Sequence, residues 1–374
     1  MATPIQLSGE KLFAYRVLAS GLDRTTGPGD LAVLDLGVQD RDGSAPIALH
    51  ARVSGDVPGI GEPHEDSGLV QLWSLRGSPH VHRRSAAREL AGVLAPISEA
   101  DALARLVGSG KALQANDVAA LDALDRTAAA MREATGSPIV KGALSAAVTR
   151  ALPDSMSGHC TGCGTVHVLE MLFRSAALPA GLGLVPGTKP VVLERLPGRR
   201  PSVNGDGPGN YLTAWYRLYG AAGVAEAAAH LGSTATALKP ALPDLVPATV
   251  SGGATRTTAE LAEAIDSVEP DRISDLVRLL PPGDPLLATR DRKLLTDNAA
   301  LTKSLWPALG PAGAVLAHGQ LAGSWRPRRK ATSLTIEVTT VRTLGRAQRA
   351  ALQVEAEGIG ALRGADNTTL LYVT

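Results

Sequence analysis

Residues 36–42 read Leu-Gly-Val-Gln-Asp-Arg-Asp, and the polar end of this run opens a predicted helical segment. Residues 72–80 read Leu-Trp-Ser-Leu-Arg-Gly-Ser-Pro-His. The loose alternation of residues 69–75 predicts a strand, and Gly77, Ser78 and Pro79 predict the turn that ends it. Working outward, apolar residues at helical spacing from Leu12 predict a first helix, and Asp30 is a candidate N-cap for a second. Residues 44–53 predict a third helix, so three helices precede a strand and a turn, which is the pattern of a winged helix.

The same order of helices and hairpin recurs along the chain. A second round has predicted helices at residues 117–135, 139–151 and 166–178, then a hairpin at residues 182–193 that turns at Pro186 and Gly187. A third round has predicted helices at residues 212–218, 224–230 and 236–242, with strands around residues 245–250. The tail differs, with short predicted strands at residues 313–317, 319–325, 333–338 and 370–373 and a helix at 343–357.

We therefore predict an α+β protein built from three tandem winged-helix domains and a small β-rich C-terminal domain. The predicted bounds are residues 1–100, 101–198, 208–279 and 280–374. A linker rich in proline and glycine at residues 197–208 separates the second and third winged helices.

Composition narrows the function. The chain has 374 residues, of which 44% are hydrophobic and 20% charged, as expected for a soluble globular protein. Aromatic residues make up only 3%, which argues against a single-strand binder that stacks bases on aromatic rings. The net charge is +1, so a nucleic-acid partner requires basic residues gathered on one face. The sequence shows no signal peptide and no stretch apolar enough for a membrane span, which predicts a cytoplasmic protein.

Five segments together resemble a known family. The resemblance is to the tandem winged-helix DNA-repair proteins, the AlkZ-type DNA glycosylases, and the segments follow in that family's order. They are residues 36–42, 72–80, 211–220, 279–285 with 290–292, and the Gly-x-x-x-Gly-x-Trp hairpin at 319–325. Any one of these segments is a weak signal, but five in order support the fold. The resemblance implies duplex DNA as the partner.

The resemblance also implies a catalytic residue. In that family two glutamines spaced Gln-x-Gln do the chemistry, and Gln39 matches the first, while Arg41 stands where the second is expected. Breaking an N-glycosidic bond passes through an oxocarbenium-like sugar that water attacks, and an amide can orient that water without adding a full charge. Arginine has donors and no acceptor, so Asp42 or Asp40 would have to assist through a one-residue shift. The alternative is that residues 39–42 cap the next helix or contact DNA.

Two basic clusters are candidate DNA contacts. Arg76, His80 and His82 lie with Arg83 and Arg84 at the predicted tip of the first wing, where cations commonly meet phosphates. The densest run follows the Trp-containing hairpin and consists of Arg326, Arg328, Arg329 and Lys330. Each phosphate contact by such a residue steepens the salt dependence of binding. A solvated surface without a partner is the alternative for both clusters.

The only cysteines, Cys160 and Cys163, are followed by His167 and preceded by His159. Their types suit zinc, but a tetrahedral site takes four ligands and no second pair stands elsewhere in the sequence. The alternative is a cysteine-bearing loop that leads into a helix carrying His167. We therefore predict no metal and no cofactor, with Cys160, Cys163 and His167 as weak candidates for zinc.

The sequence thus leaves two functions open. One is a DNA glycosylase that excises alkylated or cross-linked bases from duplex DNA, with Gln39 orienting water and Asp42 or Arg41 assisting. The other is a non-catalytic DNA-binding protein, a regulator or a damage-recognition protein, on the same scaffold. In both, three domains in one chain predict a monomer that is associated with the nucleoid.

Overall fold

The structure is a computed structural model that describes residues 3–65, 68–197 and 207–373. It combines helices with four β-sheets, so the predicted α+β class is confirmed. Most of the predicted linker at residues 197–208 lies outside the described residues. In the part of the chain that the structure describes, no helix is both long and apolar enough to cross a membrane.

The first part of the chain surrounds the stretch at residues 36–42. Ser8 caps α1 by accepting from the backbone N–H of Lys11 (3.4 Å). Gly37, with φ of 87°, ends α2 and turns the chain into β2. The elements are β1 (Ile5–Leu7), α1 (Gly9–Ala19), α2 (Val33–Leu36), β2 (Val38–Gln39), α3 (Ser44–His50), β3 (Ile60–Gly61), β4 (Leu69–Trp73), β5 (Pro79–Arg83) and α4 (Ala87–Val93).

The second part carries a helical core and two hairpins. Residues 139–151, predicted as one helix, begin as a two-residue strand that pairs with β10 before α8 starts. Residues 166–178 were also predicted as one helix, but they divide into β8 and α9. The elements are α5 (Glu99–Leu106), α6 (Gly108–Ala115), α7 (Ala120–Ala134), β6 (Ile139–Val140), α8 (Lys141–Ala151), β7 (Ser157–Cys160), β8 (Thr165–Val168), α9 (Glu170–Ala177), β9 (Leu182–Leu184) and β10 (Val192–Arg195).

One seven-stranded sheet joins these two parts. Its strand order is β2-β5-β4-β9-β10-β6, with β3 pairing in parallel beside β4. The central joint is the antiparallel pair β4–β9, whose register is Gln71 opposite Leu184. The sheet therefore crosses the predicted boundary between the first and second domains.

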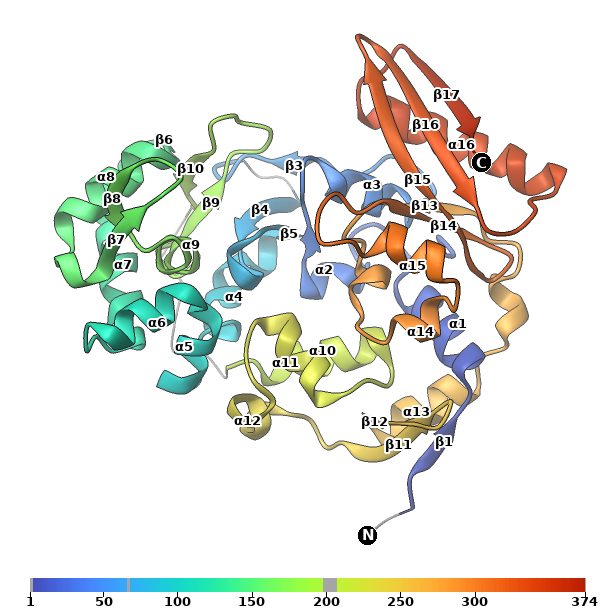
Figure 1. Cartoon of the computed structure of the whole chain (residues 1–374), viewed down its shortest axis with the longest axis horizontal. Coiled ribbons are helices and arrows are strands. Elements are labelled where there is room, and N and C mark those ends of the chain that lie inside the picture. The colour runs from blue at the N-terminus through green and yellow to red at the C-terminus, as the bar shows by residue number, and fades with distance from the viewer. Residues whose placement is uncertain (1–2, 66–67, 198–206, 374) are drawn as a thin grey trace.

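The third part of the chain packs against the N-terminal segment. Its hairpin, β11 with β12, takes β1 as a parallel third strand, with Gln6 opposite Thr249. Helix α1 lies against α10 and α13, so the ends of this region are packed together (Figure 1). The elements are α10 (Gly209–Tyr219), α11 (Val224–Leu231), α12 (Ala235–Leu238), β11 (Val246–Val250), β12 (Gly253–Thr257) and α13 (Ala259–Asp266).

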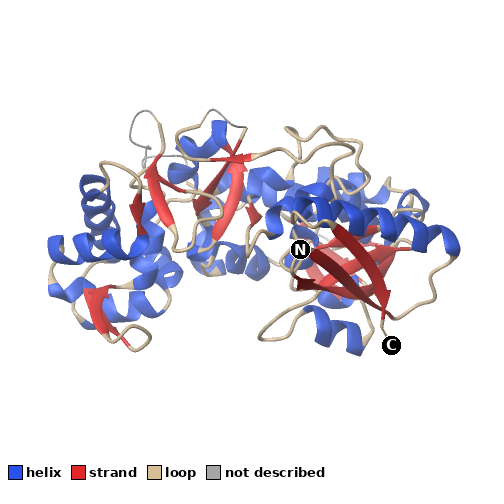
Figure 2. Cartoon of the chain, turned by 90° about the horizontal axis from the view of Figure 1, so that it is seen from above, coloured by secondary structure: helices blue, strands red, loops and turns tan. Residues whose placement is uncertain are grey.

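The C-terminal part is a five-stranded sheet in the order β13-β14-β15-β16-β17, backed by α16. Figures 1 and 2 show the long strands β15 and β16 at one end of the elongated molecule. Trp325 is buried and donates its Nε1–H to the carbonyl of Leu280 (2.8 Å), and a Cβ at Gly313 would lie 2.3 Å from that nitrogen. The elements are β13 (Arg278–Leu280), α14 (Arg292–Leu295), α15 (Ala299–Leu305), β14 (Gly313–Ala317), β15 (Gln320–Lys330), β16 (Ser333–Thr340), α16 (Arg346–Leu362) and β17 (Asn367–Tyr372).

Candidate active site around Gln39

The backbone at Gln39 is fixed on both sides. It lies opposite His80 in the antiparallel pair β2–β5, and its carbonyl accepts from the Ser44 hydroxyl (3.1 Å). That hydroxyl oxygen also accepts from the backbone N–H of Arg41 (2.9 Å). Asp40 accepts from the N–H of Ala45 (3.0 Å), so the helix-capping alternative holds for Asp40. Hydrogen bonds of the Ser44 and Asp40 side chains therefore hold the turn that begins at Gln39.

The side chain of Gln39 is half-buried, and its amide faces the loop after β13. A Cβ on Gly283 would lie 3.2 Å from Oε1 of Gln39, so this loop approaches the amide closely. Gly283 has φ of +79°, a conformation that favours glycine. Among the residues that the structure describes, no group forms a hydrogen bond with the Gln39 amide. The amide is thus presented with its donor and acceptor free.

A buried ion pair holds the loop that faces Gln39. Asp284 accepts two hydrogen bonds of 2.8 Å from the guanidinium of Arg52, and both side chains are fully buried. The guanidinium also donates to the carbonyls of Ser20 (2.8 Å) and Ala48 (2.7 Å), so most of its donors are satisfied. A bidentate pair with these additional bonds fixes geometry as well as charge. Arg52 was not singled out from the sequence, and Asp284 was noted only as part of the segment 279–285, without a role of its own.

His80 and His82 were predicted at the wing tip, and that placement is wrong. Both are buried in β5, whose three middle residues are covered on both faces, and Val81 between them belongs to the first core. Burial lowers the pKa of His80 to about 4 and that of His82 to about 3. His80 Nδ1 donates to the Ser78 carbonyl (2.9 Å), and His82 Nε2 bonds with the Ser74 hydroxyl (2.9 Å). Both rings are therefore neutral at pH 7, and their buried hydrogen bonds give them a structural role in β5.

The tip itself carries Arg76, in the 3-10 turn at Leu75–Gly77. Its side chain is exposed, yet its Nη1 donates to the carbonyl of His230 in α11. A mainly apolar cavity of about 240 Å³ lies beside Arg76, between the sheet and helices α4, α5 and α7. Arg83 and Arg84 fold back: Arg83 pairs with Asp35, and Arg84 donates to the Pro63 carbonyl (2.7 Å).

Helix α10 covers the other side of this region with aromatic rings. The Tyr211 hydroxyl donates to the Leu36 carbonyl (3.0 Å) and therefore accepts from His230 Nε2 (2.8 Å). Burial lowers the pKa of His230 to about 3, which keeps this ring neutral as well. Tyr219 donates to the Pro285 carbonyl (3.0 Å), next to the Gly283 loop. His230 was not predicted from the sequence, where its signal is a single polar ring in an alanine-rich helix.

The side chains of Arg41 and Asp42 both lie outside the group of buried residues around Gln39. The Arg41 side chain is exposed and, among the described residues, its guanidinium has no hydrogen-bond or ion-pair partner. Asp42 has a side chain 80% exposed, 3.8 Å from Nζ of Lys189, and its carbonyl accepts from Arg363 (2.7 Å). Its φ of 52° places it in a turn. The structure therefore does not bring Asp42 to the Gln39 amide.

The four basic residues of the second cluster lie on the exposed end of β15. Arg328 pairs with Glu337 on β16 (2.7 Å), and Arg329 donates to the carbonyl of Arg363 (2.7 Å) at the end of α16. Arg326 and Lys330 are exposed, and within the described ranges neither charge is paired. One of the four charges, that of Arg328, is thus neutralised by a carboxylate of the same sheet.

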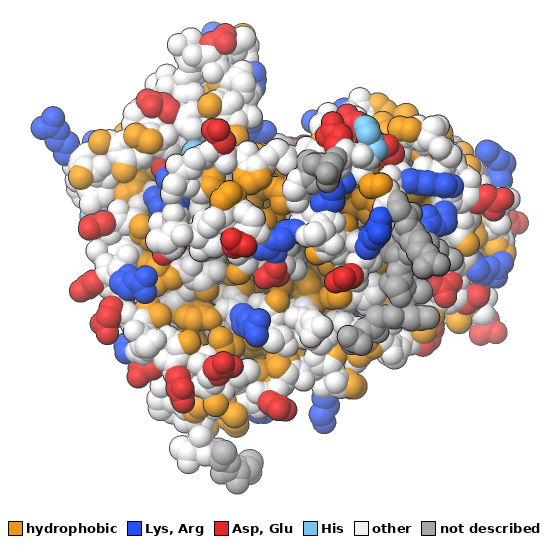
Figure 3. Space-filling view, turned by 180° about the vertical axis from the view of Figure 1, so that it is seen from behind, with side chains coloured by type: hydrophobic (Ala, Val, Ile, Leu, Met, Phe, Trp, Pro, Cys, Tyr) orange, Lys and Arg blue, Asp and Glu red, His pale blue; other side chains and the backbone are white. Residues whose placement is uncertain are grey.

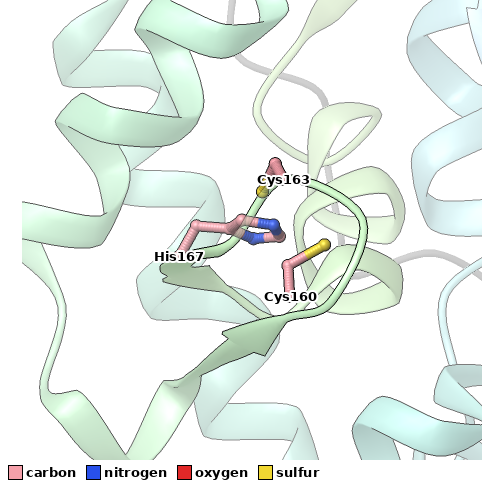
Figure 4. Close-up of side chains that lie close together, drawn as sticks. All are labelled: Cys160, Cys163 and His167. Atoms are coloured by element: carbon pink, nitrogen blue, oxygen red, sulfur yellow. The ribbon is translucent and has the colours of Figure 1, made fainter.

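Cys160, Cys163 and His167 come together at the end of the β7–β8 hairpin, which corrects the prediction of His167 on a helix. One ligand atom from each lies within 4.8 Å of the others (Figure 4). Backbone N–H groups of Cys163 and Gly162 bond to the Cys160 sulfur and lower the pKa of that thiol.

Comparison with known proteins agrees with this fold. The family model described as DNA glycosylase AlkZ-like matches residues 31–362, and the chain belongs to that family. The solved structure of the Streptomyces sahachiroi DNA glycosylase AlkZ superposes with a TM-score of 0.70 at 18% identity. The match covers 99% of this chain and 100% of that chain, so the two share their fold. No curated protein matches the chain.

Proposed function

We propose that this protein is a DNA glycosylase that excises alkylated or cross-linked bases from duplex DNA. The observation that carries the proposal is the free amide of Gln39, which the β2–β5 pair and the Gly283 loop hold in place. A rigid amide with no partner of its own can bind a water molecule through Oε1 and donate through Nε2. Family membership over residues 31–362 supports the same activity.

The chemistry follows from what a neutral amide can do. The N-glycosidic bond breaks with its electron pair leaving on the base, the sugar becomes oxocarbenium-like, and water held by Gln39 adds to the anomeric carbon and loses its proton to solvent. The amide dipole stabilises the developing positive charge without the desolvation cost of a buried carboxylate. Alkylated purines already carry a positive charge, so their departure requires little acid catalysis. The neutral His80, opposite Gln39, maintains the strand position and adds no competing charge.

Arg41 takes a different role in this proposal from the glutamine of the family pattern. Its exposed guanidinium has donors only, which suits a phosphate next to the target nucleotide and not the nucleophile. Asp42 is assigned no catalytic part, because its exposed carboxylate is directed toward Lys189. Gln39 is therefore the single residue that orients water.

The three tandem winged helices remain part of the proposal. Its support is the repeated order of helices and an antiparallel pair: α1 to α3 with β4–β5, α7 to α9 with β9–β10, and α10 to α12 with β11–β12. The domain bounds proposed are those expected from the sequence, 1–100, 101–198, 208–279 and 280–374. One monomer binds duplex DNA on a concave face that contains Gln39.

Charge limits where the duplex can lie. The face in Figure 3 mixes Lys and Arg with Asp and Glu and carries no continuous basic band. We assign the duplex to the surface around Arg41 and Arg76, whose side chains are exposed. The proposed contact with DNA phosphates extends along β15 through Arg326, Arg328, Arg329 and Lys330.

Base release from duplex DNA containing 7-methylguanine tests the proposal. The wild-type protein should release the base, and Gln39→Ala should lose release by about a hundredfold or more, the typical cost of losing an electrostatic or water-positioning group. Gln114→Ala is the matched control, because Gln114 is an exposed glutamine on α6. Equal release by wild type and Gln39→Ala would remove Gln39 from the mechanism.

The second candidate is a non-catalytic DNA-binding protein, and the observation that favours it is arginine at position 41. A cation there opposes the oxocarbenium and favours phosphate. In this case the wild type binds the duplex and releases no base across lesions that include 7-methylguanine and an interstrand cross-link. DNA binding is measured in the same samples, so that a lack of base release can be distinguished from a loss of DNA binding.

A further inference from the structure

The hairpin formed by β7 and β8 is a two-stranded sheet set apart from the larger sheets. Its base is anchored, because Val168 is buried in the second core and its N–H donates to the Thr149 hydroxyl (2.9 Å). The tip of the hairpin is not anchored in this way. Residues 161–166 are exposed, and a Cβ at Gly164 would meet nothing within 4 Å. An isolated two-stranded hairpin is marginally stable in water, so a cross-link at the tip would have a structural purpose.

The register places the candidate donors on one face of the hairpin. Cys160 pairs with Thr165, and Gly158 pairs with His167. Because residues two apart on a strand share a face, His167 lies on the same side as Thr165 and its partner Cys160. His159 is adjacent to Cys160 and faces the opposite side. This alternation selects His167 and excludes His159 as a ligand.

Cys163 joins them from the turn. The N–H of Gly164 donates to the Cys160 carbonyl (2.9 Å), and Gly164 has φ of +69°, so the turn curls back over β7. Figure 4 shows the three side chains grouped at this end of the hairpin. Their ligand atoms lie within 4.8 Å of one another, so a small inward rotation of the side chains brings them to the bonds of about 2.0 to 2.3 Å that one zinc ion makes.

The donors are also oriented for a metal. His167 Nδ1 donates to the carbonyl of Val168 (2.7 Å), which fixes the proton on Nδ1 and leaves the lone pair on Nε2. Ligating histidines usually have such a bond from the second ring nitrogen. The Thr165 hydroxyl lies 3.2 Å from the sulfur of Cys163, and backbone N–H groups face the sulfur of Cys160. Each donor thus has a supporting partner of its own.

We propose that Cys160, Cys163 and His167 bind one Zn²⁺ ion, with solvent in the fourth position. Two thiolates and an imidazole are ligands that zinc prefers, and they come from a segment of eight residues in the order Cys-x-x-Cys-x-x-x-His. The ion ties the turn to β8 and so replaces the apolar packing that the exposed tip lacks. This site is remote in the sequence from Gln39 and does not depend on the proposed glycosylase activity.

Zinc content of the full chain tests the proposal. The protein is purified under reducing conditions, incubated with zinc chloride, separated from free metal by gel filtration and measured by mass spectrometry of the metal. We expect about one zinc per chain in the wild type, and background zinc in Cys160→Ser, Cys163→Ser and His167→Ala. His159→Ala is the matched control and should keep its zinc. Circular dichroism confirms that each variant is folded.

A second measurement reports on the ligands themselves. Cobalt in place of zinc should give a thiolate charge-transfer band in the wild type that is lost from each single cysteine variant and from the double variant Cys160→Ser with Cys163→Ser. Removal of metal by a chelator should increase hydrogen exchange in residues 157–168. The proposal is overturned if the reduced wild type binds no zinc, or if the double cysteine variant binds as much as the wild type. Loss of zinc from His159→Ala would overturn this ligand set.

Discussion

At the scale of single residues, Arg41 is the position that most affects the proposed chemistry. Its charge lies two residues from Gln39 and opposes the positive charge that develops on the sugar. Arg41→Gln should therefore raise the single-turnover rate of base release by about tenfold, which corresponds to about 1.4 kcal/mol in the barrier. Arg41→Lys keeps the charge and should leave the rate near that of the wild type. A slower Arg41→Gln at saturating protein would show that the phosphate contact of Arg41 promotes the reaction more than its charge opposes it.

The buried histidines make stability depend on pH. Burial lowers the pKa of His80, His82 and His230 from 6.5 to about 4, 3 and 3, so the folded protein holds these rings neutral. The unfolded chain binds protons below pH 6.5, and stability is therefore full above 6.5 and declines as the pH falls toward 4. Each ring contributes a slope of about 1.4 kcal/mol per pH unit within that window.

Urea unfolding at several pH values between 7 and 4.5 checks this expectation. His82→Gln, which keeps a polar group beside Ser74, should show a shallower decline than the wild type. Gln in place of the exposed His159 is the control and should follow the wild-type curve. An identical pH dependence in His82→Gln and the wild type would contradict a neutral, buried His82.

At the scale of elements, the loop between β13 and α14 depends on the pair of Arg52 and Asp284. Asp284→Ala leaves a buried guanidinium uncompensated and should lower the free energy of unfolding by about 3–5 kcal/mol. Arg52→Met combined with Asp284→Leu removes both charges and should cost less than the single change. Urea unfolding measures both, with Asp366→Ala as a surface control. A double variant as unstable as Asp284→Ala would show that lost packing, and not the unpaired charge, is the cause.

Strand β15 supplies the second element-scale prediction. Arg326 and Lys330 carry charges without a described partner, whereas Arg328 is paired with Glu337. Arg326→Ala or Lys330→Ala should each reduce the slope of log binding constant against log salt by about 1, since one phosphate contact is lost. Arg328→Ala should change the slope less. Arg126→Ala, on α7, is the control, and equal slopes in all variants would exclude β15 from the interface.

Elements with strong local patterns were predictable from the sequence. Residues 313–317 were predicted as a strand and form β14, and the hairpin at 182–193 forms β9 and β10 with its turn at Pro186 and Gly187. The prediction was wrong where an element is short and held by distant pairing. Residues 139–140 belong to a sheet only because β10 lies beside them, and β8 depends on β7 across a glycine turn.

The candidate site was predictable only in part, for a related reason. Gln39 lies in a local motif, so the sequence alone could single it out as a candidate. The partners that fix its surroundings come from distant residues: Gly283 faces its amide, and Asp284 reaches Arg52 across more than two hundred positions. His80 and His82 look like surface cations in the sequence because burial of a strand face is a tertiary property.

At the scale of the whole molecule, the sheets connect parts of the chain that the predicted domain bounds separate. β1 pairs with β11, and the seven-stranded sheet runs from β2 in the first part to β6 in the second. Because backbone hydrogen bonds cross these boundaries, the winged helices of the proposed architecture are parts of one framework. The first and third parts also share one apolar core, which contains Leu34, Tyr211 and Trp215.

The joint in that sheet has a mechanical consequence. Gln71 stands at the pairing of β4 with β9, and its side-chain amide donates to Asp40 (2.6 Å), the residue next to Gln39. The apolar clusters that contain Val70, Leu72 and Trp73 cross the same joint, because they also contain residues of the second part such as Leu178 and Phe173. The second part is therefore mechanically connected to the strand of Gln39 through β4, and a load on this joint would act on the core packing and on the Gln71–Asp40 bond together.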